Sequence, residues 1–250
     1  YARAYGSAVY GDASITAFAG NAGDVSLTAT GNWWSETGYI QLDYATEGFN
    51  GRLIDAGSEA WIGGEAAYRL VGRAVSGKAG IIVLDAGTSI QIAGDVVSHA
   101  DSHVDDGYGG FADLTARTGD AGPVTLTARG GDITTGLIDT HASGAQGWAG
   151  DGLYTPAGIG GDGGEVIATI TGSSGSITID GITSYGGTGG DGAIGDAGGK
   201  GGNVTLTVDD GDIHIGYQSD GFNYNSIDAY GGDGGYSYQS GTPGGAGGAG

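Results

Sequence analysis

One motif recurs five times along the chain and constrains its fold more than any other feature. It reads Gly, then Asn, Lys or Asp, then Ala or Gly, then Gly, any residue, and finally Val or Ile. The final residues, here called the anchors, are Val25, Ile82, Val124, Val166 and Val204, and they lie 57, 42, 42 and 38 residues apart. A repeat of this length is typical of stacked units that share one core.

Each anchor opens a short run in which apolar and polar residues mostly alternate, as in Val-Thr-Leu-Thr at 124–127. Alternation with a period of two predicts a strand with one buried and one solvated face. Strands are therefore expected to begin near 25, 82, 124, 166 and 204. The apolar residues predicted to share an inward column with the anchors are Leu27, Leu84, Leu126, Ala168 and Leu206.

Two further short strands follow in each repeat, for example at 131–133 and 137–139. Three places after the key apolar residue of the last strand comes what we call the ring position. Its occupants are Gly57, His99, His141, Tyr185 and Tyr230. Because four of these five residues carry rings, we expect the rings of adjacent repeats to stack.

Glycine-rich arms join the third strand of one repeat to the next motif, and they account for much of the glycine content of 59 in 250 residues. The glycines do not fall at every third place and proline is scarce, which excludes collagen. The intervening Val, Ile, Leu, Thr and Tyr favour strands and argue against disorder. Two arrangements fit the arms: turns with extra rungs, or polyglycine-like extended stretches.

No single repeat has enough apolar residues to close its own core, so the copies are expected to stack and bury their apolar columns together. The predicted fold is all-β, a parallel β-solenoid of about five repeats of about 42 residues, with residues 1–250 forming one array. A repeat makes either one wide coil or two coils of about 20 residues. Both chain ends fall within an arm, which predicts a segment of a longer array.

Composition excludes several classes of function. The chain has no cysteine, so it forms neither disulfides nor thiolate metal sites. Its formal net charge of −21 repels nucleic acid and anionic membranes, so neither is expected as a partner. No apolar run approaches the roughly 18 residues of a membrane span.

Two segments resemble the coils of filamentous-haemagglutinin-type exoproteins of bacteria. They are Val-Thr-Leu-Thr-Ala-Arg-Gly-Gly-Asp-Ile-Thr-Thr-Gly-Leu-Ile-Asp at 124–139 and Val-Thr-Leu-Thr-Val-Asp-Asp-Gly-Asp-Ile-His-Ile-Gly at 204–216. The resemblance implies a right-handed parallel β-helix, secretion to the cell surface, and an adhesive or fibrous role. The Gly-Gly-Ala runs near the C-terminus are similar in composition to glycine-repeat surface proteins of mycobacteria.

One segment combines imidazole and carboxylate groups in a regular pattern. His99, Asp101, His103 and Asp105 alternate, so an extended backbone places all four on one face. These ligands suit zinc or a similar divalent ion. The competing interpretation is a solvated arm in which His99 simply occupies the ring position.

A second candidate metal site lies in the Gly-Gly-Asp-Gly sequences at 160–163, 189–192 and 231–234. Calcium-binding β-rolls use glycine and aspartate because tight turns bring carboxylates and carbonyls together. Asp162, Asp191 and Asp233 are the calcium ligands that this interpretation predicts. The nine-residue spacing of such rolls is missing, and ordinary turn chemistry also accounts for these aspartates.

The sequence therefore predicts an extracellular structural or adhesive protein that needs no cofactor, other than calcium if the second site is real. We expect self-association into a fibre or surface matrix, with carbohydrate or a neighbouring cell surface as a further partner. An enzyme is not expected. The alternatives are a cation-binding surface protein or a polysaccharide lyase or hydrolase, for which Arg52, Arg69 and Arg73 in the irregular first repeat would be available.

Overall fold

The structure, a computed structural model, describes residues 2–9, 12–30, 39–42, 52–65, 69–105, 111–144, 146–149, 152–153, 158–172, 174–190, 195–216, 227–237 and 244–250. Within these ranges the named secondary-structure elements are all β-strands, and the strands form four sheets. The described residues form no helix that is long and apolar enough to cross a membrane. The predicted all-β architecture with parallel sheets is confirmed.

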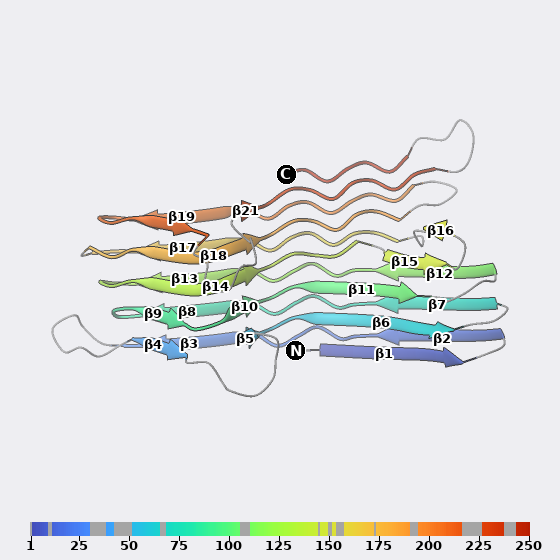
Figure 1. Cartoon of the computed structure of the whole chain (residues 1–250), viewed down its shortest axis with the longest axis horizontal. Helices are drawn as coiled ribbons and strands as arrows, with labels where there is room; N and C mark the ends of the chain where they lie inside the picture. Colours follow the sequence, from blue (N-terminus) through green and yellow to red (C-terminus); the bar gives the residue numbers. More distant parts are fainter. Residues whose placement is uncertain are drawn as a thin grey trace.

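Two of the sheets lie together at the left of Figure 1 and enclose the hydrophobic core. The anchor sheet has the order β19-β17-β13-β8-β3, with β3 at Val25–Ala29, β8 at Ile82–Ala86, β13 at Val124–Ala128, β17 at Val166–Ile170 and β19 at Val204–Val208. The facing sheet has the order β20-β18-β14-β10-β5 and also includes β4, β9 and β21. Its strands are β4 (Ile40–Leu42), β5 (Arg52–Asp55), β9 (Ile90–Ile92), β10 (Asp95–Val97), β14 (Ile133–Asp139), β18 (Ile177–Thr183), β20 (Ile213–Ile215) and β21 (Ile227–Asp228).

The other two sheets carry the arms away from the core and back again, at the right of Figure 1. The outgoing sheet has the order β1-β6-β11-β15-β16, with β1 at Ala2–Val9, β6 at Ser58–Glu65, β11 at Ala100–Asp105, β15 at Gln146–Ala149 and β16 at Gly152–Leu153. The returning sheet has the order β12-β7-β2, with β2 at Asp12–Phe18, β7 at Arg69–Val75 and β12 at Phe111–Arg117. All pairs in these sheets are parallel except β15 with β16.

The register of the anchor sheet shows how many circuits one repeat makes. Val124 pairs with Ile82 on one side and with Val166 on the other, each 42 residues away in sequence. One repeat therefore makes one complete circuit of the coil, here called a layer. Of the two arrangements that the sequence allows, the structure has the single wide coil and not the two coils per repeat.

The core sits between the anchor and facing sheets. The predicted inward columns are confirmed, because Ile82, Leu84, Val124 and Leu126 have no exposed surface. They pack with isoleucines of the facing sheet, chiefly Ile90, Ile133, Ile138, Ile177 and Ile182. Burying one such side chain stabilises the fold by about 1.5–3 kcal/mol. No layer has a core of its own, so this burial also holds the layers together.

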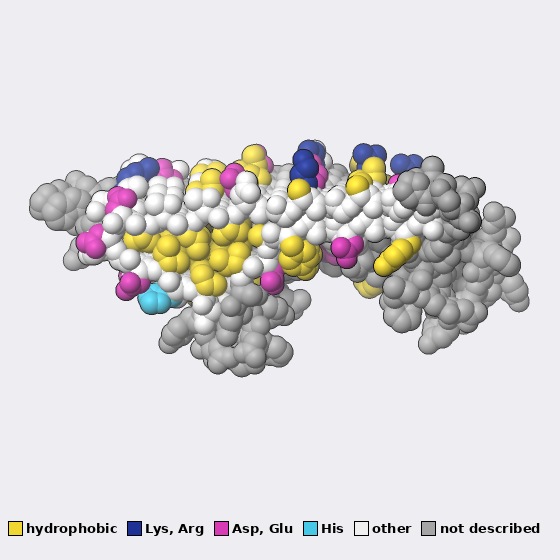
Figure 2. Space-filling view, turned by 90° about the horizontal axis from the view of Figure 1, so that it is seen from above, with side chains coloured by type: hydrophobic (Ala, Val, Ile, Leu, Met, Phe, Trp, Pro, Cys, Tyr) yellow, Lys and Arg dark blue, Asp and Glu magenta, His cyan; other side chains and the backbone are white. Residues whose placement is uncertain are grey.

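The last layer leaves part of this core open. Val204, Leu206 and Val208 of β19 are only half-buried, while Ile213 is 44% and Ile227 45% exposed. Figure 2, which looks down onto this end, shows hydrophobic side chains gathered there in one patch. The equivalent residues of the middle layers are buried because another layer covers them, whereas no described strand covers β19.

The two invariant glycines of the motif are explained by the distance between layers. A Cβ atom at Gly119 would overlap the carbonyl of Gly77 below it, and one at Gly122 would overlap the carbonyl of Gly80. The fourth motif residue also ties the two sides of a layer together, because Gly122 N donates to Ser98 O at 3.0 Å. Gly80, Gly164 and Gly202 make the same bond, to Ala56, Thr140 and Ser184. These positions therefore require glycine because the next layer leaves no room for a side chain, and not because of a positive φ angle.

The described arms of the upper layers pack mainly through backbone hydrogen bonds. Gly186 N and Gly189 N donate to the layer above, at Tyr230 O and Asp233 O, while Gly187 N donates across the layer to Gly161 O. The two donors to the layer above, Gly186 and Gly189, are thus three residues apart, which is the period of a polyproline II helix. These arms match the polyglycine-like alternative, whereas the arms of the lower layers form the strands β6, β7, β11 and β12.

Candidate functional site

A ladder of four rings rises along the side of the molecule where the facing sheet meets the arms. His99 stacks on His141 with centroids 5.2 Å apart, His141 on Tyr185 at 4.8 Å, and Tyr185 on Tyr230 at 5.2 Å. Their planes are inclined by 14°, 25° and 10°. The predicted stacking between adjacent repeats is confirmed.

The backbone of each layer fixes the height of its ring. The residue after each ring donates to the carbonyl of the next ring residue above, as Ala142 N does to Tyr185 O at 3.0 Å and Gly186 N to Tyr230 O at 2.9 Å. The spacing of these hydrogen-bonded layers, about 4.8 Å, is close to the stacking distance of two rings. The ladder therefore follows directly from placing rings at one position of successive repeats.

Asp139 lies beside the two imidazoles at the lower end of the ladder. Its Oδ1 accepts from His141 Nδ1 at 2.5 Å and from Thr183 Oγ1 at 2.7 Å, and its Oδ2 lies 3.8 Å from His99 Nδ1. Burial alone would raise the pKa of Asp139, but the hydrogen bonds and the nearby imidazoles outweigh it and lower the pKa to about 2. Asp139 is thus a buried anion at neutral pH.

His99 is the most enclosed ring of the ladder, with 3% of its surface exposed. Its Nε2 lies 3.0 Å from Glu59 Oε1, which belongs to the layer below. The position under His99 is Gly57, where a Cβ atom would lie close to the backbone and ring of His99. Glu59 and Asp139 therefore place carboxylates on both sides of this imidazole.

A groove of about 510 Å³ runs beside the ladder. It is lined by the rings of His141, Tyr185 and Tyr230, by glycines, and by the polar residues Asp101, Ser143, Thr188 and Asp233. The pKa of Tyr185 is raised to about 12. Burial is the largest cause, and the electrostatic effects of Asp139, Tyr230, Asp101 and Asp228 add to it. The groove is therefore a region of negative potential.

A second column of polar residues follows the second motif position through the layers. Lys78 Nζ lies 2.7 Å from Asp120 Oδ2, and Asp162 Oδ1 accepts from the backbone N–H of Lys200 at 2.8 Å. Lys78 lies next to Asp120, and Asp162 next to Lys200, because the repeats stack in the order in which they occur in the sequence. Asp162 thus makes an interlayer hydrogen bond in a column that holds lysines as well as aspartates.

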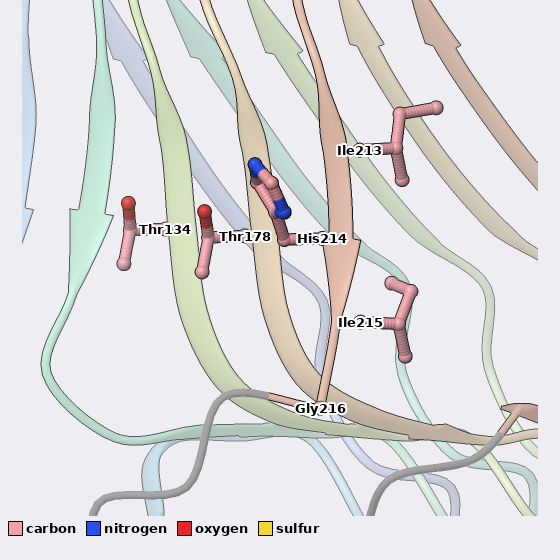
Figure 3. A pocket seen from close by; sticks show the side chains of 6 residues that line it. All are labelled: Thr134, Thr178, Ile213, His214, Ile215 and Gly216. Carbon is pink, nitrogen blue, oxygen red and sulfur yellow. The ribbon is translucent and has the colours of Figure 1, made fainter.

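A second hollow, of about 610 Å³, lies along the edge strand β20. Thr134, Thr178 and His214 are in register on β14, β18 and β20 and point to one side of the sheet, while Ile213 and Ile215 point to the other (Figure 3). The hollow thus includes groups from both faces of one sheet edge. This is the space that a further strand of the facing sheet would fill.

The residues of the proposed zinc site are only partly within the described structure. His99 belongs to the ring ladder, and Asp101 accepts from Ser143 Oγ at 2.5 Å. His103 and Asp105 lie in β11, but their side chains are outside the described part. Among the side chains that are described, no group of three or more metal-binding residues comes together. The four-residue zinc site remains a prediction.

The three aspartates of the calcium hypothesis lie in different surroundings. Asp162 belongs to the column of Lys78 and Lys200, whereas Asp233 lines the groove beside Tyr230. Asp191 lies outside the described residues. A calcium site that joins Asp162 to Asp233 is not present in the described part of the chain, and calcium binding itself remains a prediction.

Asp139, Glu59 and Thr188 are the residues of this region that sequence reasoning missed. A signal for Asp139 does exist, because aspartate stands two places before the ring position at 55, 139 and 228. Glu59 and Thr188 follow no such repeat. Their role depends on which side chains of neighbouring layers they meet.

Comparison with known proteins adds no relative. No family model matches the chain, and no curated protein or solved structure is significantly similar to it.

Proposed function

We propose that the chain is part of a right-handed parallel β-solenoid of about five repeats that serves outside the cell as a structural or adhesive fibre. The observation that carries this proposal is the uniform register of the anchor sheet. Strands β3, β8, β13, β17 and β19 pair residue for residue without a shift. A layer built in this way can be added repeatedly at the same spacing.

The open end of the array supports the same function. The half-buried side chains of β19 and the exposed Ile213 and Ile227 present apolar surface where a further layer fits. Among the described strands, β19 and β20 stand at the edges of their sheets. An uncovered strand edge favours addition of another strand. The filament would grow along the stack, while the negative charge keeps filaments apart sideways.

The chemistry of the described residues supports a structural role more than a catalytic one. Arg129 is paired with Asp85 and Lys78 with Asp120 on exposed faces, and the buried anion Asp139 is held by hydrogen bonds within the ladder. Each of these charged groups is used to join two layers.

The experiment that tests this function is negative-stain electron microscopy of the purified chain across salt concentrations. Salt above about 0.15 M reduces the Debye length below about 8 Å and weakens repulsion between acidic copies. We expect filaments whose fibre diffraction shows a repeat of about 4.8 Å along the axis. Isolated short particles under all conditions would contradict the fibre, and turnover in a panel of acidic polysaccharides would contradict the non-enzymatic role.

A further inference from the structure

The groove beside the ring ladder spans four layers. Asp101 belongs to the layer of His99, and Asp233 belongs to the layer of Tyr230, three layers above it. At about 4.8 Å per layer, the two carboxylates are roughly 14 Å apart along the stack. The groove is therefore elongated, with an acidic group near each end.

The walls of the groove favour a hydrogen-bond donor with positive charge. Asp101 and Asp233 are the only charged side chains that line it among the described residues, apart from the imidazole of His141. Thr188 and the hydroxyls of Tyr185 and Tyr230 supply further acceptor oxygens along its length. The carboxylates of Asp139 and Asp228 add to the negative potential at Tyr185.

The ring ladder argues against a ligand that binds by stacking. Sugars and aromatic molecules use the faces of aromatic rings, but the faces of His141 and Tyr185 are already covered by their neighbours in the ladder. Only edges and hydroxyls remain along the groove. The exposed ring of Tyr230, 55% exposed, is the exception, and it is at the upper end.

A single metal ion does not fit the two carboxylates either. Calcium holds its oxygen ligands at 2.3–2.6 Å, so groups about 14 Å apart cannot share one ion. A flexible chain with cationic groups along its length reaches both. The groove therefore fits an extended organic cation better than a metal.

We propose that this groove binds a linear polyamine, an alkyl chain with several ammonium groups, lying along the stack from Asp101 to Asp233. The ammonium groups at its ends pair with these two carboxylates, and those between them donate to Thr188 and the tyrosine hydroxyls. This binding site lies on the side of the array and does not depend on whether the chain forms a fibre.

The test is isothermal titration calorimetry of the purified chain with spermine at low salt. We expect saturable binding of one spermine per groove. The double variant Asp101→Asn/Asp233→Asn should raise the Kd at least about 10-fold, because it removes both ionic contacts and leaves the amide oxygen to accept from Ser143. The control Asp210→Asn/Asp212→Asn removes the same charge from exposed residues outside the groove and should change the Kd less than about twofold.

Two further measurements separate this site from general attraction to an acidic protein. The short diamine 1,3-diaminopropane, which cannot reach both carboxylates, should bind at least about 10-fold more weakly than spermine. Bound spermine should also lower the pKa of Tyr185, because a nearby cation favours the tyrosinate, and nuclear magnetic resonance of labelled tyrosine reports this. Equal losses in the two double variants, no preference for the longer amine, or no saturable binding would each overturn the proposal.

Discussion

The two halves of each layer are stabilised in opposite ways. In the half formed by the anchor and facing sheets, large side chains such as Leu126 and Ile138 are completely buried and fill the space between the sheets. In the glycine arms of the upper layers, backbones approach one another directly, and glycines such as Gly187 and Gly232 leave no room for a Cβ atom. The chain therefore changes from apolar packing to backbone hydrogen bonding within one circuit.

This contrast teaches that the same repeat is sensitive to opposite kinds of mutation in its two halves. Removing methyl groups is harmful where side chains fill the core, because it leaves a cavity. Adding one methyl group is harmful in the arms and at the motif glycines that follow them, because the atoms that it would meet belong to the backbone of the next layer. The first two predictions below test the two sides of this difference, and the smaller ones test the polar contacts between layers.

The largest effect is expected from Gly122→Ala. Its Cβ atom would overlap the carbonyl of Gly80 and disturb the hydrogen bond to Ser98, so we expect a loss of about 3 kcal/mol or more in the free energy of unfolding. Chemical denaturation followed by circular dichroism measures it. Gly23→Ala is the matched control, because it has the same motif position in the first layer and nothing within 4 Å of its Cβ. Equal effects of the two variants would show that layer spacing is not the cause.

The next largest effect is expected from Leu126→Ala in the core half. Leu126 has no exposed surface, and a cavity of this kind costs about 2–5 kcal/mol of unfolding free energy. Leu206→Ala removes the equivalent side chain from the half-buried last layer and should cost about 1 kcal/mol in the isolated chain. If filaments form, the cost at Leu206 should rise toward that at Leu126. Equal costs in the isolated chain would contradict the open end.

A smaller effect is expected from Asp139→Asn. Folding lowers the pKa of Asp139 from 3.8 to about 2, so this carboxylate contributes roughly 2 kcal/mol at neutral pH. The contribution is complete above a pH of about 4 and is lost as the pH falls toward 2. Denaturation as a function of pH should therefore show the variant and the parent chain converging in acid.

Asp228→Asn is the matched control for this pH dependence. Asp139, Thr183 and Asp228 occupy one column of paired residues, but the ring position of the layer of Asp228 holds Tyr230 and not histidine. The variant removes a carboxylate of the same column that has no histidine at its ring position, so it controls for the loss of charge alone. A pH profile of Asp139→Asn parallel to that of the parent chain would contradict the role of the buried anion.

The smallest effect is expected from Asp120→Asn on the exposed face. The hydrogen bond and charge of Asp120 raise the pKa of Lys78 above its ordinary value of 10.5. The variant should return the pKa of Lys78 toward that value, as measured by nuclear magnetic resonance of the lysine side chain. Little change in the denaturation midpoint is expected, because exposed ion pairs contribute little to stability. An unchanged pKa of Lys78 would show that the pair does not form in solution.

Much of the fold could be predicted because it repeats. The anchors from Val25 to Val204, their inward leucines and the ring column each depend on one residue at one place in every copy, and all were correctly predicted. The number of coils per repeat could not be decided in this way. It depends on which strands pair with one another. One coil or two coils per repeat would require the same alternation of apolar and polar residues, so the sequence does not distinguish them.

The candidate site was less predictable than the fold. The alternation of His99 and Asp101 suggested one metal-binding face, but His99 is enclosed between Glu59 and Asp139 and stacks on His141. The groove beside the ladder joins residues of four layers, and no local pattern relates Asp101 to Asp233. Such a site arises from the stacking of layers, so a pattern within one repeat does not contain it.

The sequence alone determined the phase of the repeat, the residues that face the core and the column in which the rings stand, because each is a periodic property of the chain. The tertiary structure decided how wide a coil is, where the arms become strands and where they become polyglycine-like, and which acids lie beside which rings. These properties depend on the distance between backbones in neighbouring layers. Gly122 shows the division most clearly, since the sequence gives its position and only the carbonyl of Gly80 beneath it gives the reason.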